Sequence, residues 1–112
     1  MPPRLPLPDD KRLTVVFSVE PGCLGPTGLD HVDRFCKFSL GEFNIVDYGF
    51  IRWEVVPRHD KAAPEIQYRI QNKLLPRDKA GQFLKLFHKN IDAFEGKIYD
   101  KITHQIDEYF GR

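Results

Sequence analysis

The sequence lacks most of the features that reveal a function directly. Its 112 residues include two cysteines, one tryptophan and one methionine, and the formal net charge is only +1. Two cysteines make no disulfide framework, so we expect two free thiols. The balanced charge gives no basic surface for nucleic acid or for an anionic membrane, and it indicates neither partner.

Long apolar runs are also missing. No stretch approaches the roughly 18 to 20 apolar residues of a membrane span, and the N-terminus has no apolar core of a secretory signal. We therefore expect a cytoplasmic protein with no membrane partner. Its length, with 41% hydrophobic and 29% charged residues, is typical of one globular domain.

Motifs for catalysis and cofactors are absent too. The sequence has no glycine-rich phosphate loop, no serine elbow and no paired metal-binding histidines. A zinc site made of Cys23, His31 and Cys36 matches no common spacing, and it would take Cys36 from the buried side of a helix. The sequence thus predicts no cofactor and no metal, and it leaves open whether the protein is an enzyme.

Proline is concentrated at one end of the chain. Residues 1–11, MPPRLPLPDDK, hold four prolines among few apolar anchors. This composition favours an extended, partly polyproline-like arm that is flexible, followed by a single domain over residues 12–112. The arm resembles a proline-rich ligand by composition only.

Three stretches alternate with the period of a β-strand. The longest is YGFIRWEVV, residues 48–56, which we take as the central strand. One of its faces is apolar and predicts a core position for the tryptophan: Ile51, Trp53 and Val55. The other face is half polar: Phe50, Arg52, Glu54 and Val56. RLTVVFSVE at residues 12–20 and EIQYRIQ at residues 65–71 predict the other two strands.

Apolar residues at helical spacing predict three helices. The first spans about residues 28–40, with Leu29 and Phe35 on its apolar side and a capping box between Thr27 and Asp30 at its start. The second begins near residue 76. The third is the longest and starts after Asn90, which we expect to be its cap.

The order strand, helix, strand, strand, helix, helix predicts an α+β fold. A right-handed crossover through the first helix makes the first two strands parallel. We expect a three-stranded sheet with helices packed on one face, in a truncated ferredoxin-like arrangement. The third strand would form a long hairpin with the second and lie antiparallel between the first two.

Parallel strands one and two would bring the loops EPGCLGPTG and PRHD to the same edge of the sheet. The candidate binding residues there are Glu20, Cys23, Arg58, His59 and Asp60, beside helix amides that favour an anion. Cationic and imidazole neighbours would lower the pKa of a Cys23 thiol, as a nucleophile requires. The alternative is a cysteine tucked under the loop and a surface ion pair between Arg58 and Asp60.

Two functions remain. The first is a non-catalytic interaction or regulatory module that self-associates as a homodimer, because a small sheet leaves unpaired edges, and that has a further protein partner. The alternative is a thiol-dependent enzyme or redox sensor that uses Cys23 near His59. An RNA-binding sheet built on Phe50, Arg52 and Arg69 lacks the aromatic signature of that class, so nucleic acid is not an expected partner.

Overall fold

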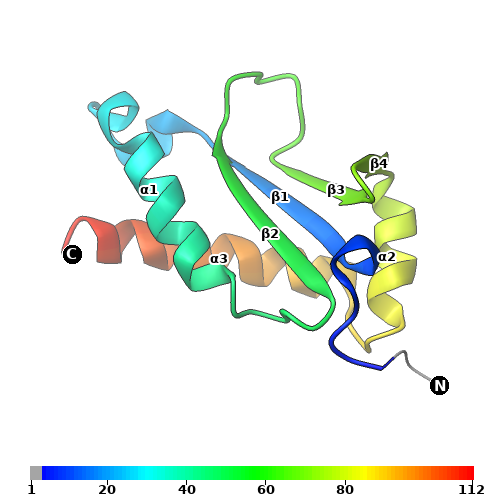
Figure 1. The fold of residues 1–112 in the computed structure, drawn as a ribbon. Helices are drawn as coiled ribbons and strands as arrows, with labels where there is room; N and C mark the ends of the chain where they lie inside the picture. Colours follow the sequence, from blue (N-terminus) through cyan, green and yellow to red (C-terminus); the bar gives the residue numbers. More distant parts are fainter. Residues whose placement is uncertain (1–3) are drawn as a thin grey trace.

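The computed structural model describes residues 4–112 and has an α+β fold, as predicted (Figure 1). A mixed four-stranded sheet is accompanied by three α-helices. Two short 3-10 turns, η1 and η2, flank the first strand. The elements are η1 (Asp9–Lys11), β1 (Leu13–Val19), η2 (Pro21–Leu24), α1 (Gly28–Phe43), β2 (Ile51–Pro57), β3 (Ile66–Ile70), β4 (Lys73–Leu75), α2 (Arg77–Lys85) and α3 (Ile91–Tyr109).

The strand order is β2-β1-β3-β4. β1 and β2 are parallel, as predicted, with Leu13 opposite Ile51. β3 pairs antiparallel with β1 on its other side, so the predicted position of β3 between β1 and β2, and the predicted hairpin of β2 with β3, are both wrong. The reason lies in β1, where Val15, Val16 and Phe17 are all buried. A strand that is apolar on both faces belongs at the centre of a sheet, so β1 is central and β2, which we predicted to be the central strand, lies at the edge.

The sheet also has one more strand than we predicted. β4 is three residues long and pairs antiparallel with β3, with Ile70 opposite Lys73. Gln71 and Asn72 join the two strands with φ angles of 53° and 64°. Two central residues with positive φ make the type I′ turn, whose twist suits a tight hairpin. Gln-Asn is a weaker signal for this turn than Asn-Gly, which is why the strand was missed.

Trp53 lies in the core, as the alternation predicted. Its side chain is 7% exposed and packs against Phe43 and Phe94, with ring centroids 4.7 and 5.7 Å away. The indole Nε1 donates a hydrogen bond to the Val46 carbonyl at 2.8 Å. Phe50, which we expected on the half-polar face, is instead buried and stacked on Phe87 at 4.2 Å. It precedes β2 and so does not follow the alternation of the strand.

The ends of the helices differ in how well they were predicted. Asn90 caps α3, and its side chain accepts a hydrogen bond from the Ala93 N–H at 3.1 Å. Thr27 makes no side-chain cap on α1; the Asp30 N–H bonds the Thr27 carbonyl instead. Leu29, placed on the apolar side of α1, is 80% exposed, whereas the buried side of the helix is formed by residues such as Val32 and Phe35.

Part of the predicted arm contacts the domain. The Leu7 side chain is buried, and its N–H donates to the Gly49 carbonyl at 2.7 Å. Arg12 Nε donates in turn to the Leu7 carbonyl at 2.9 Å. Residues 1–3 of the arm lie outside the described residues, and the flexibility of the arm stays a prediction.

Candidate functional site

The two loops that we expected to meet emerge at the same end of the sheet. β1 ends at Val19 and β2 at Pro57, and these residues are partners in the parallel register. The Arg58 N–H continues the pairing by donating to the Val19 carbonyl at 2.8 Å. The parallel arrangement therefore places the segment after Val19 beside the segment after Pro57.

Three of the five candidate residues share one hollow of about 410 Å³: Glu20, Arg58 and His59. The start of α1 forms another wall, with Gly28 and Leu29. A Cβ atom on Gly28 would lie 1.8 Å from the Pro21 carbonyl oxygen, so only glycine allows α1 to begin this close to the preceding turn.

Arg58 and Asp60 use their polar groups to hold their own loop. Arg58 Nη2 donates to the carbonyls of Lys61 and Ala63, at 3.0 and 2.8 Å. Asp60 Oδ1 accepts a hydrogen bond from the Ala62 N–H at 2.9 Å. The expected ion pair of Arg58 with Asp60 is not among the ion pairs within residues 4–112. His59 is left as the exposed imidazole of the hollow.

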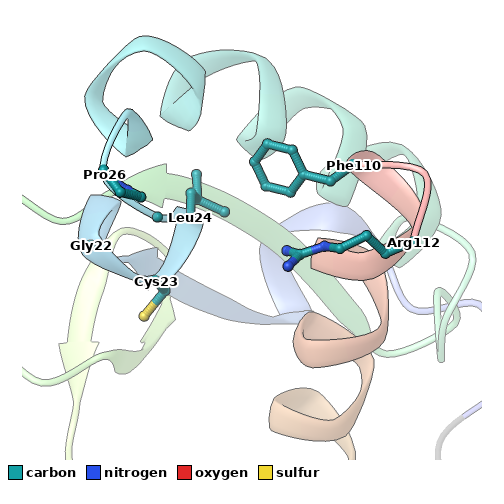
Figure 2. A pocket seen from close by; sticks show the side chains of 7 residues that line it. Gly22, Cys23, Leu24, Pro26, Phe110 and Arg112 are labelled. Atoms are coloured by element: carbon teal, nitrogen blue, oxygen red, sulfur yellow. The ribbon is translucent and has the colours of Figure 1, made fainter.

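Cys23 lies beside a second hollow, of about 480 Å³, on the turn η2. That hollow is closed by the C-terminal residues Phe110 and Arg112 rather than by His59. Figure 2 shows the Cys23 thiol pointing away from the Phe110 ring. Cys23 and His59 therefore do not line a common hollow.

The thiol environment also differs from the expectation. Burial raises the pKa of Cys23, and the carboxylates of Glu65 and Glu20 raise it further, while Arg58 opposes them. Negative neighbours disfavour the thiolate, so the expected lowering of this pKa is wrong. His59 is not among the groups that shift it. The other cysteine, Cys36, is buried on α1, and burial raises its pKa to about 11.

Glu65 is the residue of this region that the sequence analysis missed. It comes just before β3, and its carbonyl accepts a hydrogen bond from the Ser18 N–H at 2.8 Å. Its carboxylate accepts another from the Tyr99 hydroxyl at 3.3 Å. Because β3 runs antiparallel to β1, the start of β3 lies at the end of β1. The antiparallel direction of β3 was therefore the feature from which the position of Glu65 near the end of β1 could have been predicted.

A second cluster of charged groups connects β3 with α2 and α3. The Tyr68 hydroxyl donates to Glu95 at 2.6 Å, and burial together with this bond raises the pKa of Tyr68. Arg77 contacts Glu95 and Asp92 at 3.0 and 2.6 Å. Each of these groups already has a partner, so the cluster joins secondary structure elements. Within the described part of the chain, no group of three or more His, Cys, Asp or Glu residues is placed to hold a metal ion.

Apolar side chains are exposed at the opposite end of β2. Ile45 is 79% exposed and Tyr48 59% exposed, and both line a hollow of about 420 Å³ with Leu5. We call Leu5, Ile45 and Tyr48 the β2 entry patch. Exposed apolar groups that are close together are typical of an interaction surface.

Comparison with known proteins identifies no relative: no family model, no curated protein and no solved structure matches this chain. Among the helices of residues 4–112, none has the length and apolar character to span a membrane. Any functional conclusion therefore depends on the geometry described above.

Proposed function

We propose that this protein is a non-catalytic interaction module of the cytoplasm that self-associates as a homodimer and presents a surface to a further protein partner. The main support for the proposal is the position of β2, a seven-residue strand that lies at the edge of the sheet. An edge strand of this length exposes a row of backbone donors and acceptors that can pair with another chain.

The β2 entry patch supports the same conclusion. Ile45 and Tyr48 lie in the connection from α1 to β2 and remain mostly exposed, although Phe50 of the same connection is buried, as is Phe43 at the end of α1. A partner that pairs with β2 would also remove this apolar surface from water, which favours association.

The alternative, a thiol-dependent enzyme or redox sensor, gains no support from the site. The pKa of Cys23 is raised, whereas an activated thiol needs it lowered. His59 lines a different hollow from Cys23 and is not among the groups that shift the pKa of the thiol, so nothing in the site supports it as the base that the alternative requires. The interaction module is therefore the better proposal.

Sedimentation equilibrium of the full chain tests self-association. We expect a mass of twice 13.1 kDa at high micromolar concentration, falling toward the monomer mass on dilution. Leu74→Asp, on the exposed face of β4 at the other edge of the sheet, is the matched control and should leave the mass unchanged. A monomer mass at every concentration would overturn the proposal.

A further inference from the structure

The outer edge of β2 carries the unpaired backbone groups. The Leu13 N–H donates to the Phe50 carbonyl at 3.0 Å, and the Arg58 N–H donates to the Val19 carbonyl. The backbone N–H and carbonyl groups of the even-numbered residues in this segment therefore point toward β1. The Ile51 N–H turns away from β1 and donates to the Asp47 carbonyl at 2.9 Å. Because the direction of the backbone N–H and carbonyl groups alternates along a strand, those of the odd-numbered residues of β2 point away from β1, toward the open edge of the sheet.

These outward groups are available to another chain. Over residues 4–112, the N–H groups of Trp53 and Val55 and the carbonyls of Ile51 and Trp53 have no hydrogen-bond partner beyond this edge. The opposite edge of the sheet offers much less. β4 has three residues, of which only Leu74 faces outward, and Pro76 then leads into α2.

The side chains on β2 add charge of both signs. Arg52 and Glu54 are exposed on the face of the sheet opposite Trp53. Their register partners on β1 are Thr14 and Val16, which carry no charge. Neither Arg52 nor Glu54 belongs to an ion pair within the described residues. An isolated subunit therefore leaves both charges unpaired.

Building on the proposed self-association, we propose that a second copy of the chain pairs with β2 in an antiparallel register, with the two-fold axis at Trp53. In this register Arg52 of each copy lies directly opposite Glu54 of the other. The Trp53 residues exchange hydrogen bonds across the axis, and each Val55 N–H meets the Ile51 carbonyl of the second copy. All the backbone groups used are those left free in the single chain.

The charges select this register over its neighbours. An axis at Arg52 or at Glu54 would place like charges directly opposite each other, which is destabilising. It would also centre the contact on residues whose backbone groups already bond β1. Only the axis at Trp53 combines free backbone groups with opposite charges, and a two-fold interface makes each favourable contact twice.

The pairing has a consequence for the candidate site. Antiparallel strands bring the start of one β2 to the end of the other, so Ile45 and Tyr48 of one copy come to the end where Arg58 and His59 of the other line their hollow. β2 is the edge strand of the sheet in one chain (Figure 1). In the proposed dimer the two sheets would join through β2 into one continuous sheet. Two surfaces that are separate in one chain thus become neighbours in the dimer.

Charge reversal on the full chain tests the register. Arg52→Glu alone and Glu54→Arg alone each convert both cross-strand attractions into repulsions, and each should weaken the dimer about tenfold or more. The double variant R52E/E54R restores opposite charges and should dimerise like the wild type. An equal mixture of the two single variants should form a heterodimer. Arg34→Glu, an exposed reversal on α1, is the matched control, and circular dichroism confirms that each variant is folded.

The outcomes separate this inference from the proposed function. Weakening by each single reversal, with recovery in both the double variant and the mixture, supports the register. If the wild type dimerises but the single reversals leave its affinity unchanged, or if neither combination recovers it, the register is overturned and self-association stands. If the wild type is monomeric throughout, both proposals are overturned.

Discussion

Trp53 is the residue on which the core depends most. Replacing it with alanine should lower the free energy of unfolding by about 3 to 5 kcal/mol, because the change leaves a cavity beside Phe43 and Phe94. It also leaves the Val46 carbonyl without its donor. Urea denaturation followed by far-UV circular dichroism measures the loss. A loss below about 1 kcal/mol would contradict this account of the core.

Cys23 should react slowly. The pH midpoint of its alkylation by iodoacetamide should lie above the value of about 8.5 for a free thiol, since burial and two carboxylates disfavour the thiolate. Glu65→Gln should lower the midpoint, Arg58→Gln should raise it, and His59→Ala should leave it unchanged. Peptide mass spectrometry follows Cys23 separately from Cys36. A midpoint below the free-thiol value, raised by His59→Ala, would instead restore the thiol hypothesis.

Sequence alone could place some of these residues and not others. Trp53 was predictable because Ile51, Trp53 and Val55 alternate with charged residues within one strand. The raised pKa of Cys23 was not foreseen, because it depends on Glu65, which is remote in the chain and is placed near Cys23 by the antiparallel pairing of β3 with β1 rather than by any pattern within one element. Periodicity reports what lies within an element, whereas electrostatics depends on what lies between elements.

Two helices are joined by a buried polar pair. Ser39 Oγ on α1 donates to Gln105 Oε1 on α3 at 2.5 Å, Gln105 Nε2 donates to the Ser39 carbonyl at 3.4 Å, and both side chains are fully buried. Ser39→Ala and Gln105→Leu should each cost about 1 to 3 kcal/mol, because each leaves a buried partner unpaired. The double variant should cost less than the sum. Strict additivity in urea denaturation would show that the contact contributes nothing.

Tyr68 joins β3 to α3 in a pH-dependent way. Its pKa is raised by burial and by Glu95, so folding favours the neutral phenol. That stabilisation is complete below the unfolded pKa of about 10 and is lost as the pH rises above it. Tyr68→Phe should cost about 1 kcal/mol at neutral pH and then lose less stability than the wild type toward strongly alkaline pH. If urea denaturation showed that the wild type and Tyr68→Phe lose the same stability toward alkaline pH, the pH dependence assigned to Tyr68 would be wrong.

The elements themselves were largely predictable, and their order in the sheet was not. Alternation and helical spacing identified β1, β2, β3 and all three helices. The place of β1 between β2 and β3 depends on burial of both faces of β1, including Val16 at 4% exposure, and the polar Thr14 and Ser18, two residues to either side on the same face, concealed that burial. β4 was too short for its three residues to show a period.

At the scale of the whole molecule, the two edges of the sheet differ in how well they could meet a second copy, because β2 is long and β4 is short. We propose that the outer edge of β2, the edge that faces away from β1, is paired in the dimer and unpaired in the monomer. Exposed ion pairs are screened by salt, so the charges on Arg52 and Glu54 should set the register while the backbone bonds and the β2 entry patch hold the dimer together.

Hydrogen exchange at the Trp53 and Val55 amides, resolved by NMR, tests this claim most directly. In dilute solution both amides should exchange readily, and at high micromolar concentration they should become protected as β2 pairs with its copy. The Arg58 amide, bonded to Val19 within one chain, is the internal reference and should not change with concentration. Protection of Trp53 and Val55 that is the same at both concentrations, in a protein that dimerises between them, would contradict the account.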